Sequence, residues 1–164
     1  MDLDYDPPLT IREGRPDEAH LIASAFREMW LDNAIVEEDI EPDWELRVEA
    51  FVAEGRERAH LRFFLAERDE ELVGAACCQL FQGLYPAILK GSLRKYGYIW
   101  SVYVARHERR QGMGRRLTEV CVQALAELDC THVVLHAAPM GKSVYAAMGF
   151  VPTNEMRLIL PPSR

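Results

Sequence analysis

The chain has 164 residues, of which 26 are acidic and 19 basic, so its formal net charge is −7. Hydrophobic residues make up 49% of the chain, a share that indicates one globular domain over residues 1–164 and argues against disorder. The acidic balance argues against a nucleic-acid-binding protein, because such proteins usually present a broad basic face.

The N-terminal residues and the apolar runs bear on where the protein is found. Residues 1–6 are acidic and lack the basic and apolar regions of a secretory signal. The longest apolar runs, such as the one ending at Leu80, are shorter than the ~20 residues that a transmembrane helix needs. We therefore expect a cytoplasmic protein with no membrane partner.

One strand and two helices are predicted in the first third of the chain. Residues 9–12 have the pattern of a short strand. Pro16 and the acids that follow it are typical of a helix start, and apolar residues at helical spacing continue that helix through residues 21–30. A second helix is predicted from Pro42 to about Arg58.

The middle of the chain predicts an antiparallel hairpin and then a long loop. The two strands cover residues 61–66 and 72–80 and are joined by a short charged turn. Residues 82–95 contain Gly and Pro and have the length of a functional loop. The apolar residues 98–104 form the next predicted strand.

The last third predicts alternating helices and strands. A helix is expected from Gly112 to about Leu128, and a strand over residues 131–137 follows it. A short helix over residues 143–148 precedes a last strand over residues 156–160. Since no linker or repeat divides the chain, all strands are expected in one sheet with helices on its faces.

The cysteines and histidines do not predict a metal site. The four cysteines include no C-x-x-C pair, and adjacent Cys77 and Cys78 would point to opposite faces of a strand. His132 and His136 have i,i+4 spacing, but in a strand this spacing does not bring two side chains to one ion. We expect buried, reduced thiols and no metal.

The strongest chemical signal is an anion-binding turn between a strand and a helix. Gly112 and Gly114 would let backbone N–H groups approach a phosphate, and the new helix adds the positive end of its dipole. Five arginines fall between residues 106 and 116 of this acidic chain. A dinucleotide fold is excluded because G-x-G-x-x-G is incomplete, and a P-loop before Gly141 is excluded because its first glycine would fall at His136.

Two motifs resemble the GNAT (GCN5-related) N-acetyltransferases. The acetyl-CoA signature [QR]-x-x-G-x-[GA] is matched by residues 109–114 after the strand ending at Val104. A Tyr-x-x-x-Gly-Phe pattern typical of the family's C-terminal part is matched by residues 145–150. The element order also agrees from Thr10 to Leu160, so the resemblance implies a mixed, mostly antiparallel, twisted sheet of about six to seven strands, flanked by helices, in an α/β fold of the α+β type.

The resemblance implies which residues hold acetyl-CoA and which reacts. The pyrophosphate would lie on the amides of residues 110–115, and the pantetheine arm would pair with the strand before them. Tyr145 matches the position that gives a proton to the leaving thiolate. The residues implied to bind acetyl-CoA are Val102, Tyr103, Val104, Arg109, Arg110, Gln111, Gly112, Met113, Gly114 and Arg115.

The general base has no direct match in the sequence. Relatives that use a carboxylate place it on the strand before the turn, and residues 97–104 contain no Asp or Glu. Ala138 stands where many relatives have an Asn that contacts pantetheine. His136 is one candidate base, acting through water, because histidine readily exchanges protons near neutral pH. An acid from residues 37–39 is the other.

The implied function is an acetyl-CoA-dependent N-acetyltransferase that acts on a primary amine of a small molecule or peptide terminus by direct attack. The alternative is a non-catalytic acyl-CoA-binding sensor on the same fold, and a homodimer remains open. Six acids between residues 37 and 45 would attract a cationic acceptor if they face the cleft. Basic residues in the loop 82–95 would bind a carboxylate, although both charged segments can also simply face water.

Overall fold

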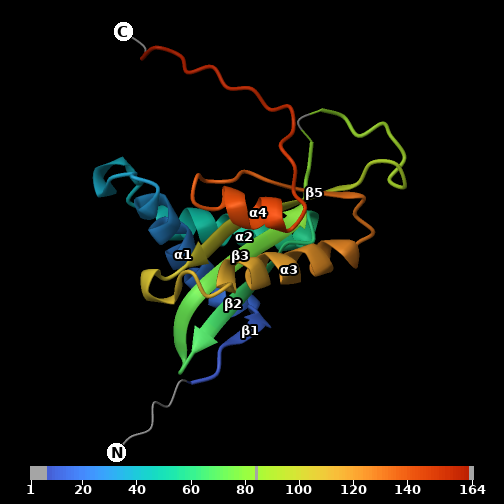
Figure 1. The fold of residues 1–164 in the computed structure, drawn as a ribbon. Coiled ribbons are helices and arrows are strands. Elements are labelled where there is room, and N and C mark those ends of the chain that lie inside the picture. Colours follow the sequence, from blue (N-terminus) through green and yellow to red (C-terminus); the bar gives the residue numbers. More distant parts are fainter. Residues whose placement is uncertain (1–6, 84, 163–164) are drawn as a thin grey trace, which may run out of the picture.

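The computed structural model describes residues 7–83 and 85–162. The acidic residues 1–6, on which the expected location partly rests, lie outside these ranges. The described residues form one sheet with the strand order β1-β2-β3-β4-β5 (Figure 1). Its strands are β1 (Thr10–Glu13), β2 (Arg62–Arg68), β3 (Glu71–Leu80), β4 (Tyr96–Val104) and β5 (His132–Leu135).

The helices lie between these strands in the order expected from the sequence. The α-helices are α1 (Ala19–Asp32), α2 (Trp44–Arg58), α3 (Met113–Ala126) and α4 (Lys142–Ala147). Short 3-10 turns are η1 (Pro16–Glu18), η2 (Glu37–Asp39) and η3 (Arg106–Glu108). Within the described ranges, none of the helices has both the length and the apolar character needed to cross a membrane.

The sheet is mixed and mostly antiparallel. Pairs β1–β2, β2–β3 and β3–β4 are antiparallel, whereas β4 and β5 are parallel. A parallel pair needs a crossover, and α3 provides it. The expected fold class is therefore confirmed.

Strand alternation divides the core into two layers, one on each face of the sheet. On β2, Phe63 and Leu65 pack with α1 and α2, while Phe64 and Ala66 pack with α3. The same alternation separates Cys77 from Cys78, as predicted. All four cysteines are free thiols, and three of them are buried.

The last predicted strand is the one expectation about the fold that is wrong. Residues 156–160 form no strand, so the sheet has five strands in the described chain rather than about six to seven. Their sequence has strand character, but residues 151–162 run away from the sheet and pair with no described strand (Figure 1). The other strands and helices lie within a few residues of their predicted bounds.

Candidate functional site

The centre of the site is a gap where β4 and β5 diverge. Their pairing ends at Ile99 and Leu135, but β4 continues to Val104. Along residues 100–104, the edge of β4 that faces away from β3 therefore has no strand partner among the described residues. A cavity of about 1550 Å³ opens here, between β4, the start of α3, α4 and the aromatic side of α1 and α2.

A bulge in β4 lies inside this cavity. The β3–β4 register shifts between Ala75 and Cys77, and opposite this shift Ser101 has φ +56°. Positive φ is rare for a residue other than glycine, and such strained residues occur often at functional sites. Ser101 is 3% exposed, and its hydroxyl has no hydrogen-bond partner in the described structure. Ser101 was not predicted from the sequence, where its only signal is a polar residue in an apolar strand.

The turn after β4, residues 109–115, has the geometry of an anion-binding site and is called the cradle below. Gly112 is the N-cap of α3 with φ +79°, and a Cβ placed there would meet nothing within 4 Å. Arg110 also has a positive φ, of 63°. In the described structure, the amides of residues 110–115 donate to no backbone carbonyl. Free N–H groups at a helix N-terminus, beside open space, are suited to bind a phosphate.

Arg109 holds the cradle against the end of β4. Its Nε donates to the Val104 carbonyl at 2.9 Å, and its guanidinium forms an ion pair with Asp32 at the end of α1. Arg106 also donates to Asp32, at 3.0 Å. Although burial opposes the effect, these arginine hydrogen bonds lower the pKa of Asp32. Asp32 was not predicted from the sequence, because its partners are more than 70 residues away.

Replacing Asp32 with Asn is expected to loosen this anchor. The change leaves Arg109 without its charged partner, so the free energy of unfolding should fall by about 1–3 kcal/mol. Because the pKa of Asp32 is lowered on folding, its contribution is present above the usual pKa of an aspartate and is lost as pH falls through the folded value. Urea unfolding at pH 7 and at acidic pH measures both effects.

The matched control is Asp17→Asn. Asp17 pairs with Arg15 at 3.3 Å, but both side chains are more than half exposed. Exposed ion pairs contribute little, so this variant should change the free energy of unfolding by less than ~0.5 kcal/mol. Equal effects of the two substitutions would contradict an anchoring role for Asp32.

Tyr145 lies on α4 and lines the cavity opposite β4. Its ring packs edge-on against Phe150, with 5.8 Å between the ring centroids. Gly141 makes room for it, since a Cβ there would come within 2.7 Å of the Tyr145 ring. Burial, with a smaller effect of Cys121, raises the pKa of Tyr145. The hydroxyl is therefore protonated at neutral pH and able to donate a proton.

His136 also lines the cavity, just after β5. Its Nδ1 lies 2.9 Å from the Tyr98 hydroxyl, and its Nε2 contacts the Glu155 carboxylate. Both ring nitrogens are therefore engaged. Tyr98 lines the cavity as well, so its hydroxyl can connect His136 to the cavity.

The far wall of the cavity is aromatic. Trp100 on β4 contacts Phe26 of α1 and Phe51 of α2 edge-on, at centroid distances of 5.2 and 5.5 Å. Trp100 Nε1 donates a hydrogen bond to Gln79 Oε1 at 3.0 Å, so the polar N–H of the indole ring already has a partner. Trp30 extends this wall. Such a surface suits an apolar group.

Neither charged segment singled out in the sequence lines this cavity. The acids at residues 37–45 are absent from its walls, and Glu37 and Asp43 form ion pairs with Arg27 and Arg47. In the loop 82–95, Arg94 lies over the Tyr96 ring in a different pocket. The cavity walls therefore do not support the expectation that the acidic segment attracts the acceptor.

The family follows from comparison with known proteins. The acetyltransferase (GNAT) family profile matches residues 21–150, which is most of the chain. The chain belongs to the GNAT family. Members of this acetyltransferase family use acetyl-CoA, which agrees with the resemblance of the cradle and of the Tyr145 region.

This GNAT domain is similar to individual proteins in sequence and in structure. Human N-alpha-acetyltransferase 30 is 35% identical over 91 residues, which cover 54% of this chain but only 23% of the human protein. The structure of a protein described as a predicted acetyltransferase, from Clostridium acetobutylicum with acetyl-CoA, has a TM-score of 0.80 at 19% identity and covers 93% of this chain and 96% of that one. A GCN5-related N-acetyltransferase from Ralstonia eutropha JMP134 has a TM-score of 0.79 at 21% identity, over 93% and 99% of the two chains.

Proposed function

We propose that the protein is an acetyl-CoA-dependent N-acetyltransferase that acetylates a primary amine of a small molecule or peptide terminus by direct attack. The observation that carries this proposal is the single cavity that joins the free edge of β4, the cradle at Gly112 and the hydroxyl-bearing Tyr145. In this cavity the chain can bind one thioester, polarise its carbonyl oxygen and donate a proton to its sulfur.

The groups that line the cavity suit the chemistry of acetyl-CoA. The free amides of residues 110–115 would bind the pyrophosphate, and the space beside Gly112 leaves room for it. The unpaired backbone at Val102 and Val104 would hydrogen-bond the pantetheine amides as a neighbouring strand would. Arg109 lines the cavity and also holds this cradle through its bonds to Val104 and Asp32. When bound, acetyl-CoA supplies the acetyl thioester that the amine attacks.

Three groups of the chain would serve the transfer itself. Backbone N–H groups on the unpaired edge of residues 100–104 would polarise the thioester oxygen. Tyr145 gives its proton to the leaving sulfur. We assign the base to His136 acting through Tyr98, because the Tyr98 hydroxyl can pass its proton to Nδ1 while it accepts one from the amine. Glu155 then stabilises the charged imidazole.

The acceptor is expected to carry an apolar group next to its amine. The aromatic wall formed by Phe26, Trp30, Phe51 and Trp100 would bind this group. The name of the human relative, an N-alpha-acetyltransferase, supports a peptide amino terminus as one such acceptor. A peptide with an apolar first side chain fits both observations.

Replacing Phe51 with Ala tests the aromatic wall. Phe51 is about half exposed, so the protein should fold normally, but the acceptor loses a ring that contributes apolar contact. The KM for the acceptor should rise by about 10-fold while the KM for acetyl-CoA stays the same. Leu46→Ala, at an exposed position of the same helix that does not line the cavity, is the matched control. An unchanged KM for the acceptor would show that the acceptor does not contact this wall.

The proposed function itself is tested by thiol release from acetyl-CoA. The purified protein is incubated with acetyl-CoA and a panel of amines that includes peptides with apolar and charged first residues. Amine-dependent release of CoA, with the acetylated amine seen by mass spectrometry, is the expected result. Binding of acetyl-CoA without release by any amine would instead indicate a non-catalytic acyl-CoA sensor.

A further inference from the structure

A buried carboxylate lies at the start of the anion-binding site. Glu108 is the last residue of η3, immediately before the cradle, and it lines the cavity. Only 6% of its surface is exposed. A negative charge two residues before the first free amide, that of Arg110, would repel a phosphate, and the repulsion is strong where water is excluded. Glu108 has no part in the transfer described above, so its place in this wall needs another explanation.

Arg68, the last residue of β2, is the partner of this carboxylate. Its Nε donates to Glu108 Oε1 at 2.8 Å, and its Nη2 donates to Oε2 at 3.2 Å. Both side chains are largely buried, with 18% of Arg68 and 8% of Glu108 exposed. Two parallel hydrogen bonds between charged groups make a strong and well-oriented pair. Arg68 does not line the cavity in the described structure, so a ligand there would meet a carboxylate that is already neutralised.

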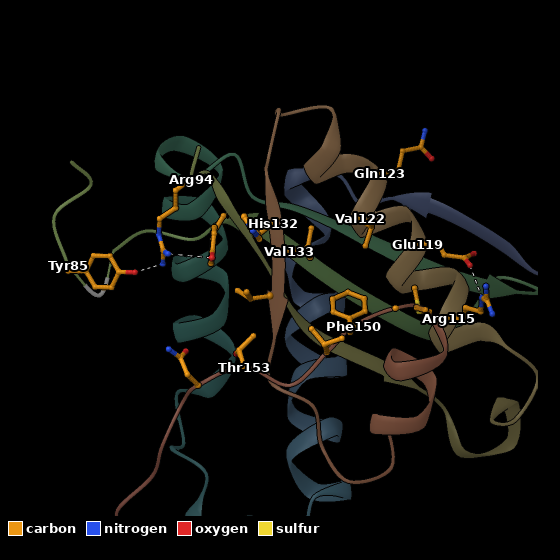
Figure 2. Close-up of a pocket in the computed structure, with 16 residues that line it drawn as sticks. Tyr85, Arg94, Arg115, Glu119, Val122, Gln123, His132, Val133, Phe150 and Thr153 are labelled. Atoms are coloured by element: carbon orange, nitrogen blue, oxygen red, sulfur yellow. Dashed lines mark hydrogen bonds and ion pairs between the residues drawn. The ribbon is translucent and has the colours of Figure 1, made fainter. Parts of the chain in front are cut away.

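Two other acids beside the cradle are also paired with arginines. Asp32 forms an ion pair with Arg109, which belongs to the cradle itself. On α3, Arg115 Nε donates to Glu119 at 2.8 Å, and both of these side chains are about half exposed (Figure 2). Water and salt therefore screen the charge of Glu119. Glu108 differs from both acids, because it is buried and its arginine comes from β2, outside the site.

This arrangement makes the charge of the cavity wall depend on a residue that a ligand does not touch. We propose that Arg68 sets the affinity of the cradle for the diphosphate of CoA by neutralising Glu108. This inference rests on the proposed function, because the acetyl-CoA site is the one that it concerns. Removing one partner of a buried ion pair leaves an uncompensated charge, whereas replacing both partners often has little effect. The two kinds of variant should therefore bind CoA differently.

Calorimetric titration with CoA tests this dependence. Arg68→Gln leaves the Glu108 carboxylate unpaired near the diphosphate, so the Kd for CoA should rise by at least about 10-fold. Arg68→Gln/Glu108→Gln removes that charge as well, and its Kd should return to within ~3-fold of the wild-type value. Arg68→Lys keeps a positive charge beside the carboxylate and should bind CoA more tightly than Arg68→Gln does.

Glu108→Gln alone separates a charge effect from a mechanical anchor. The glutamine keeps the length of the side chain and an oxygen for Arg68, but it removes the negative charge. Its Kd for CoA should stay within ~3-fold of the wild-type value or fall below it. If the ion pair acted only by holding η3 against β2, this variant and the double variant would both bind CoA at least about 10-fold more weakly. That result would overturn the inference even if Arg68→Gln failed to fold.

Arg12→Gln is the matched control. Arg12 on β1 also forms a two-bond pair, in which its Nε and Nη2 donate to Glu67 at 2.9 and 2.8 Å, but neither residue lines the cavity. This variant should unfold at a lower urea concentration and bind CoA like the wild type. An Arg68→Gln variant with wild-type affinity, or a double variant as weak as a folded Arg68→Gln, would overturn this inference and leave the proposed function intact. A wild-type chain that does not bind CoA would overturn both.

Discussion

Replacing Gly112 with Val is expected to weaken acetyl-CoA binding by at least about 100-fold. The residue has φ +79°, which a β-branched side chain does not tolerate, and its side chain would fill space that is open in the cradle. Calorimetric titration of the variant with CoA measures the loss. A melting curve recorded alongside shows whether the domain is folded, since Gly112 lies on the surface turn before α3 and not in the core.

Gly91→Val is the control for this experiment. Gly91 also has open space around its Cβ position, but its φ is not positive and it lies in the loop 82–95. This variant should bind CoA like the wild type. Unchanged CoA affinity in a folded Gly112→Val variant would show that the pyrophosphate does not lie in this turn.

Local patterns were sufficient to predict most of the fold. Alternation in the apolar strands separates Phe63 from Phe64 and Cys77 from Cys78, and both pairs lie on opposite faces of the sheet as expected. The glycines at 112 and 114 were also a local signal, since they indicated a turn at the helix start, and Gly112 is the N-cap of α3. Where residues a few positions apart decide the structure, the sequence is informative.

The features that the sequence did not predict depend on distant residues. The strain at Ser101 follows from the register between β3 and β4, and the ion pairs of Asp32 join α1 to residues after β4. The acids at residues 37–45 have a local pattern that suggested a binding surface, yet none of them lines the cavity, and Glu37 and Asp43 pair with Arg27 and Arg47. Net charge along a segment does not show which way the segment faces.

The unpaired segment at residues 156–160 is a different case. Its pattern correctly gives the strand character of the residues, but a strand also needs a partner edge, and pattern alone does not say which molecule supplies it. The same residues that read as the last strand of the sheet are 75–94% exposed where they are apolar. Local pattern and tertiary placement therefore disagree at these residues.

The second large effect is expected for Tyr145→Phe. The substitution keeps the ring and its contact with Phe150 but removes the hydroxyl that would protonate the leaving thiolate. General acid catalysis typically contributes about 10²-fold or more, so kcat should fall by roughly 10²-fold while affinity for acetyl-CoA changes little. Single-turnover kinetics measures the chemical step directly. Gly141→Ala provides a second variant, because its methyl group would displace the Tyr145 ring without changing the hydroxyl, and it should also lower kcat.

The pH dependence of kcat distinguishes a proton donor from a packing residue. Burial raises the pKa of Tyr145, so the donor stays protonated through neutral pH and is lost only as pH rises through that elevated value, above about 10. Wild-type kcat should therefore decline on this alkaline side, and Tyr145→Phe should lack the decline because it has no proton to lose. A folded Phe variant with wild-type single-turnover rates, or one that keeps the same alkaline decline, would assign Tyr145 to packing and require another donor for the thiolate.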